Sequence, residues 1–98
     1  MINYRLSNTA KEDLIRIHQF GTKQFGSNQA DKYVGQLFDS FKKIAERPFA
    51  FESVDYIKKG YRRCVSGSDS IYYRIGINTV EIMTIIGRQD LGKLKNSW

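Results

Sequence analysis

The sequence contains one cysteine, Cys64, and one histidine, His18, and this scarcity limits the chemistry open to the chain. A disulfide within the chain needs a second cysteine, and a structural zinc site needs about four Cys or His ligands. Cys64 falls in a predicted strand, where we interpret it as a small buried hydrophobic residue and not as a reactive thiol. The glycines lack the spacing of a phosphate-binding loop. We therefore expect no metal site and no cofactor.

Conventional hydrolytic catalysis also lacks the residues that it needs. His18 lies on or beside the apolar stripe of a predicted helix, far in sequence from any candidate nucleophile. We interpret it as a packed or half-exposed helical residue. The carboxylates are scattered along the chain and form no paired acid–base motif. The residues themselves therefore argue against an enzyme of the usual hydrolase or metalloenzyme classes.

Long hydrophobic runs are missing as well. A membrane-spanning helix requires ~20 apolar residues, and a secretory signal requires an apolar run of roughly 7–15 residues. The first six residues lead directly into the polar residues 7–13. We expect no membrane association and a cytoplasmic location.

The overall composition is that of one small folded domain covering residues 1–98. A hydrophobic fraction of 41% and a charged fraction of 27% are typical of a soluble globule, so global disorder is not expected. The net charge of +6 attracts acidic partners, which include nucleic acid, acidic protein segments and anionic membranes. The same charge can also serve solubility alone, so it does not decide the function.

The N-terminal part of the chain predicts a short strand followed by a helix. Residues 2–6 alternate between apolar and polar, which is the period of a strand with one buried face. Apolar residues at helical spacing form one stripe from Ala10 to Phe25. Ser7 is the predicted N-cap, and a capping box that starts at Thr9 is the competing start.

A second apolar stripe predicts a second helix over residues 30–45. Gly26 is placed to end the first helix with a positive φ, and Ser27 to cap the second. Pro48 ends the second helix, because the residue before a proline is disfavoured in the α conformation. The connection is so short that the two helices must form an antiparallel hairpin.

The remaining sequence predicts an ordered connection and then three strands. Strand-like runs cover residues 61–65, 70–75 and 80–86, and hairpin turns at 66–69 and 76–79 separate them. We therefore predict an α+β fold with an N-terminal strand at one side of a small antiparallel sheet that ends in a C-terminal three-stranded meander. The helical hairpin covers one face of the sheet and leaves the other face available.

Arginines gather in the strand half of the chain. Alternation places Arg74 on the sheet face opposite to Ile71, and only one of Arg62 and Arg63 can share that face. Arg88 directly follows the third strand. Such a cluster suits the binding of phosphates or carboxylates. The alternative interpretation is a solvated sheet surface whose charges are partly ion-paired.

Short motifs in a distinctive order extend over nearly the whole chain. They are residues 4–10, Asp13 and Leu14, Phe25 and Gly26, Gln29 and Ala30, Pro48, Arg62 and Arg63, residues 71–74, residues 80–82, Ile86 and residues 88–90. Their order and spacing resemble the RelE/ParE toxins of bacterial type II toxin–antitoxin systems, and specifically the ParE branch. The resemblance implies a toxin that forms a hetero-oligomer with a co-expressed antitoxin, whose flexible segment wraps the helical hairpin and the sheet.

The resemblance also implies two possible activities. ParE members act on DNA gyrase and block replication, whereas RelE members cut mRNA in the ribosomal A site. RNA cleavage needs basic residues for the developing charge and groups that move protons, often a Tyr or His near the C-terminus. Residues 88–98 contain neither. This favours a gyrase inhibitor that is not an enzyme and does not bind nucleic acid directly. The alternatives are a ribosome-dependent endoribonuclease and an inactive relative that only binds an antitoxin.

Two sets of candidate binding residues follow. We predict that the target is bound by residues of the strand half and the C-terminal tail, and that the antitoxin is bound by residues of the helices. The target-binding candidates are Arg62, Arg63, Arg74, Arg88 and Trp98. The antitoxin-binding candidates are Leu14, Ile17, Tyr33, Leu37 and Phe41.

Overall fold

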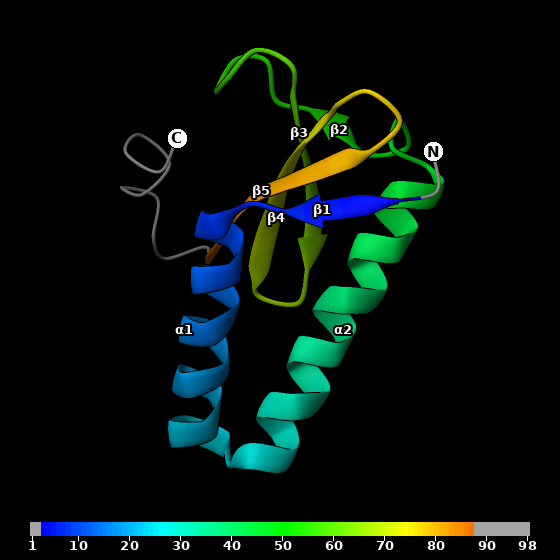
Figure 1. Ribbon diagram of the computed structural model, residues 1–98. Coiled ribbons are helices and arrows are strands. Elements are labelled where there is room, and N and C mark those ends of the chain that lie inside the picture. The colour runs from blue at the N-terminus through cyan, green and yellow to red at the C-terminus, as the bar shows by residue number, and fades with distance from the viewer. Residues whose placement is uncertain (1–2, 88–98) are drawn as a thin grey trace.

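The computed structural model describes residues 3–87, and its elements follow the predicted order. Two helices form an antiparallel hairpin that packs on a five-stranded sheet (Figure 1). The predicted α+β architecture is confirmed. In chain order the elements are β1 (Tyr4–Leu6), α1 (Asn8–Phe25), α2 (Ser27–Glu46), β2 (Glu52–Ser53), β3 (Tyr61–Ser66), β4 (Asp69–Ile75) and β5 (Val80–Gly87).

The sheet has the strand order β1-β5-β4-β3-β2. The antiparallel meander of β3, β4 and β5 is confirmed. The expectation of a purely antiparallel sheet is wrong, because β1 pairs with β5 in parallel and the sheet is mixed. The strand β2 lies within the connection that was expected to hold no strand, and it pairs with β3 at the opposite edge. Hydrophobic alternation locates a strand but carries no information on its direction, so the parallel pair could not be predicted from it.

The helix ends agree with the predicted caps at two positions and differ from them at one. Ser7 is the N-cap of α1, where its Oγ accepts a hydrogen bond from the backbone N–H of Ala10 at 3.0 Å. Gly26 has the predicted positive φ, at 89°. The prediction that Ser27 caps α2 is wrong: Ser27 is already helical, and Gly26 occupies the N-cap without a side-chain hydrogen bond. One glycine therefore ends α1 and begins α2.

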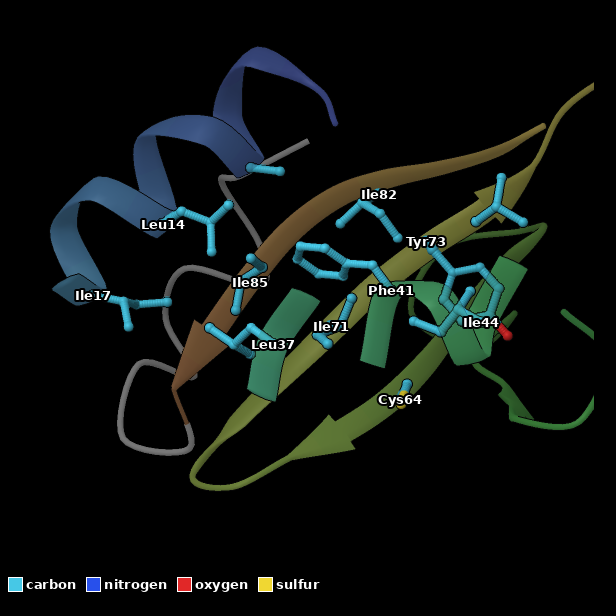
Figure 2. Close-up of a cluster of buried hydrophobic side chains, with 12 residues drawn as sticks. Leu14, Ile17, Leu37, Phe41, Ile44, Cys64, Ile71, Tyr73, Ile82 and Ile85 are labelled. Carbon is cyan, nitrogen blue, oxygen red and sulfur yellow. The ribbon is translucent and has the colours of Figure 1, made fainter. Parts of the chain in front are cut away.

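The main core lies between the helical hairpin and one face of the sheet. Leu37, Phe41 and Ile44 of α2 are fully buried there. Figure 2 shows them pointing toward the side chains that β4 and β5 direct at the helices. The sheet contributes Cys64, Ile71, Tyr73, Val80, Ile82 and Ile85 to this cluster.

A buried carboxylate fixes α1 to the edge of β5. The strand β1 pairs with β5 only as far as Ile82, so the next stretch of that edge needs other partners. Asp13 of α1 supplies one: its Oδ2 accepts hydrogen bonds from the Thr84 hydroxyl at 2.8 Å and from the Ile85 backbone N–H at 2.9 Å. Arg16 lies 3.2 Å from the other carboxylate oxygen. Asp13 therefore sets the position of α1 against the sheet.

Cys64 is buried in the core, in agreement with its interpretation as a hydrophobic residue. Burial raises the pKa of its thiol, so the reactive thiolate is scarcer than in an exposed cysteine. We expect a thiol reagent such as Ellman's reagent to react about 100-fold more slowly with the native protein than with the protein in urea. Equal rates in the two conditions would contradict the burial of this side chain.

Candidate functional site

A row of charged side chains crosses the sheet face that points away from the helices, here called the outer face. Arg5 of β1, Glu81 of β5 and Arg74 of β4 are direct neighbours in the strand register. Glu81 Oε2 accepts from Arg5 Nη2 at 2.6 Å, and Glu81 Oε1 accepts from Arg74 Nε at 2.7 Å. Arg74, and after it Arg5, lowers the pKa of Glu81, while hydrogen bonding to Glu81 raises the pKa of Arg74. The row is therefore a single carboxylate held between two guanidinium groups.

A second ion pair lies farther along the outer face. Arg63 Nε donates to Glu52 Oε1 at 2.6 Å, so β3 is tied to the edge strand β2. Arg63 also faces Tyr72 across the β3–β4 pair. Hydrogen bonds to Tyr72 and then to Glu52 raise the pKa of Arg63. Arg63 is thus the arginine that shares the outer face with Arg74.

Arg62 is directed to the other side of β3 and holds the connection that follows α2. Its Nη1 donates to the Phe51 carbonyl at 2.7 Å, and its guanidinium lies 5.1 Å from the centre of the Phe49 ring. The Tyr73 hydroxyl donates to the Pro48 carbonyl at 2.5 Å in the same region. The structure therefore separates Arg62 from Arg63 and Arg74. A role of Arg62 in target binding stays a prediction.

The outer face is less open than expected. Val54 and Ile57 of the connection before β3 pack against apolar side chains that β4 and β5 direct outward. Tyr72 and Ile86 are almost fully buried by this contact. The helices leave the second face uncovered, as expected, but the connection before β3 covers the apolar residues of that face. The part that remains accessible contains the exposed Arg5 and Arg74, the partly exposed Arg63 and the exposed Val65.

A groove of about 500 Å³ lies between the helical hairpin and the β3–β4 turn. Phe20 and Phe25 line it, and 61% and 71% of these residues are exposed. The Tyr33 hydroxyl donates to Asp69 Oδ2 at 2.5 Å and so links α2 to the turn. Burial, and then this hydrogen bond, raises the pKa of Tyr33. The helices contribute most of the apolar lining of the groove, together with Arg16 and Gln29, and the turn contributes Ser68 and Asp69.

The helix candidates for antitoxin binding lie mostly inside the protein. Leu14, Ile17, Leu37 and Phe41 are buried in the main core, and Tyr33 is half-buried beside the groove. Their part in antitoxin binding stays a prediction. Of the target-binding candidates, Arg88 and Trp98 lie outside the described residues.

Other apolar residues of the helices, which the predictions did not select, are on the surface. Phe25 belongs to the predicted apolar stripe but is exposed, because the hairpin extends past the β3–β4 turn (Figure 1). A large apolar side chain outside the core stripe is the sequence signal that could have identified such surface residues. The exposed large apolar residues of α1 and α2 are Ile15, Phe20, Phe25 and Phe38.

His18 lies on the helical surface, apart from the outer face. Its Nε2 is 2.7 Å from Asp31 Oδ1, which joins α1 to α2. Within residues 3–87, no group of three or more His, Cys, Asp or Glu side chains is placed to hold a metal ion. Neither helix of that range is apolar enough over a sufficient length to cross a bilayer.

Sequence comparisons relate the chain to known toxins. The family described as "ParE toxin of type II toxin-antitoxin system, parDE" matches residues 4–92. The chain is 39% identical over 83 residues to Toxin ParE1 of Caulobacter vibrioides, covering 85% of each protein. It is 29% identical over 84 residues to Toxin ParE1 of Mycobacterium tuberculosis, covering 85% of this chain and 86% of that protein.

Two solved structures share the fold. The chromosomal ParDE toxin–antitoxin system from P. aeruginosa contains a chain that superposes with a TM-score of 0.79 at 18% identity, covering 89% of this chain and 96% of that one. The toxin–antitoxin complex RelBE2 from Mycobacterium tuberculosis gives a TM-score of 0.56 at 19% identity, covering 89% and 98%. The predicted RelE/ParE-like fold is confirmed. At these identities the likeness concerns the fold alone.

Proposed function

Because the chain belongs to the ParE toxin family of type II toxin–antitoxin systems, we propose that it inhibits DNA gyrase in the cytoplasm and so blocks replication. It acts by binding the target protein and is not an enzyme. A cognate antitoxin neutralises it by forming a hetero-oligomeric complex.

The observation that carries this proposal is the pairing of charges on the outer face. Catalysis of RNA cleavage needs cations that are available to the phosphate and a group that transfers protons near neutral pH. Arg5, Arg74 and Arg63 are instead engaged by carboxylates. The one histidine of the chain, His18, lies on the helices and not on this face.

The exposed apolar residues of the helical hairpin support antitoxin binding. Ile15 and Phe38 line one shallow groove between the helices, and Phe20 and Phe25 line the deeper groove at the β3–β4 turn. Grooves that expose large apolar side chains are typical of protein-binding sites. The net charge of +6 favours an acidic antitoxin segment.

Purified gyrase and translated mRNA separate the two candidate activities. We expect the protein to slow gyrase supercoiling of relaxed plasmid, and we expect added antitoxin to restore it. Primer extension on translated mRNA is expected to show no new cuts. Unaffected supercoiling together with new cuts in the ribosomal A site would replace this proposal with the endoribonuclease.

Replacing Arg74 by alanine is expected to weaken growth arrest while the fold remains intact. Arg74 is half-exposed on the outer face, and loss of an exposed ion pair changes stability by less than about 1 kcal/mol. Lys42→Ala, on the exposed surface of α2, is the matched control for loss of one positive charge. Growth after induction and thermal melting are the two measurements. Growth arrest by Arg74→Ala equal to that by Lys42→Ala would remove Arg74 from the target-binding surface.

A further inference from the structure

Glu81 is the least exposed member of the charged row on the outer face. Its side chain is 19% exposed, whereas those of Arg5 and Arg74 are 70% and 47% exposed. The carboxylate of Glu81 is therefore less exposed to solvent than the two guanidinium groups that bind it. Because the three residues are neighbours in the strand register, the sheet itself fixes this arrangement.

Two arginines that converge on one oxyanion form the usual geometry of a phosphate site. A phosphate would offer one oxygen to each guanidinium, and Glu81 offers Oε2 to Arg5 and Oε1 to Arg74 in the same way. The carboxylate thus takes the place that a phosphate of RNA or DNA would occupy. At the other end of the face Glu52 pairs with the single arginine Arg63.

We propose that Glu81 is a specificity-determining residue of the outer face, which it closes to nucleic-acid backbones by occupying the phosphate position between Arg5 and Arg74. A backbone phosphate has to displace a carboxylate that is already bound by both arginines. It also meets the negative charge of that carboxylate once displaced. A partner protein whose surface carries charges of both signs can bind the arginines and Glu81 together, so it neither has to displace the carboxylate nor is repelled by it. This inference goes beyond the proposed function and does not require gyrase to be the target.

The test is the affinity of Glu81→Gln for a fluorescein-labelled single-stranded oligouridylate, measured by fluorescence anisotropy at several salt concentrations. Glutamine keeps the shape of the side chain and removes its charge. We expect the affinity to rise about tenfold over that of the wild-type protein. The dependence of log affinity on log salt is expected to steepen by about 0.7, the change for one more phosphate contact on a single strand.

Asp39→Asn is the matched control, because it makes the same change in net charge on the exposed surface of α2. We expect it to raise the affinity by no more than about twofold. The double variant Arg74→Ala/Glu81→Gln is expected to lose the gain. Thermal melting of each variant confirms that it is folded.

Glu52→Gln provides a second, independent variant, which removes the carboxylate from Arg63 but leaves its hydrogen bond to Tyr72, and is expected to give a smaller gain. If Glu81→Gln binds the oligonucleotide no more tightly than Asp39→Asn, the inference is overturned, whatever the affinity of Glu52→Gln. A gain in Glu81→Gln that Arg74→Ala abolishes supports it. The gyrase assay on the wild-type protein is scored separately. A wild-type protein that leaves gyrase unaffected would remove the proposed function and leave this inference standing.

Discussion

Asp13→Ala is expected to lower the free energy of unfolding by about 3 kcal/mol, because it leaves buried partners without an acceptor. The Thr84 hydroxyl and the Ile85 backbone N–H both donate to Asp13, whose residue is only 3% exposed. For a domain of this size the corresponding fall in melting temperature is about 12–24 °C. Urea titration and thermal melting measure the two quantities.

Asp13→Asn separates the charge from the hydrogen bonds. Both hydrogen bonds go to Oδ2, so an amide oxygen at that position can still accept them, while the amide NH2 group replaces the oxygen that pairs with Arg16. We therefore expect a loss of about 1–2 kcal/mol. Asp39→Asn on the exposed face of α2 is expected to change stability by less than about 0.5 kcal/mol. An Asp13→Ala protein as stable as Asp39→Asn would show that Asp13 does not anchor α1 to β5.

Phe41→Ala is expected to cost about 3–5 kcal/mol, the usual range for removal of a buried phenyl ring. Phe41 is 0% exposed, and its ring centre lies 5.4 Å from those of both Tyr4 and Phe38. Such a loss is a large part of the stability of a small domain. Phe20→Ala, at a residue that is 61% exposed, is the matched control and is expected to change stability by about 0.5 kcal/mol.

Variants at Phe41 and Phe20 also test which helical residues contact the antitoxin. Phe41→Leu keeps the core filled at a moderate cost, so the protein should fold and bind the antitoxin as the wild type does. Phe20→Ala should fold normally and bind it more weakly. Calorimetric titration of each folded variant with the antitoxin measures the affinity. Weakened binding by Phe41→Leu together with unchanged binding by Phe20→Ala would restore Phe41 as a direct contact.

The secondary structure was largely predictable because its signals are local. The Ser7 cap, the positive φ at Gly26 and the alternation around Ile71 each depend on a few neighbouring residues. The parallel pairing of β1 with β5 was not predictable, since direction depends on how the intervening chain folds. The burial of Tyr72 under Val54 likewise depends on a contact between segments far apart in sequence.

The candidate site was also predictable only where its signals are local. Alternation was enough to place Arg74 on the outer face, but it left open whether Arg62 or Arg63 would join it. The pairing of Arg74 with Glu81 needed the register of β4 and β5, which a bulge shifts between Tyr72 and Tyr73. Sequence periodicity does not reveal a bulge. The alternative interpretation in the sequence analysis was a sheet surface whose charges are partly ion-paired. The described part of the outer face contains such ion pairs.

Helix periodicity likewise marks the core stripe, and the part of that stripe in antitoxin binding stays a prediction. Leu37 and Phe41 were selected as binding residues because they are apolar and regularly spaced, and the structure buries both for that reason. Phe20 breaks the pattern, and an exposed apolar residue outside the stripe is the better signal of a partner.

Gyrase itself provides the decisive measurement. Gyrase, supercoiled plasmid and ATP are incubated with increasing amounts of the purified protein, and the DNA is analysed after treatment with detergent and protease. A toxin that acts on gyrase is expected to trap the cleaved-DNA intermediate, so that linear plasmid accumulates with toxin concentration and disappears when antitoxin is added first. No linear plasmid in this assay, together with an unchanged rate of supercoiling of relaxed plasmid at a large excess of the protein, would contradict gyrase as the target.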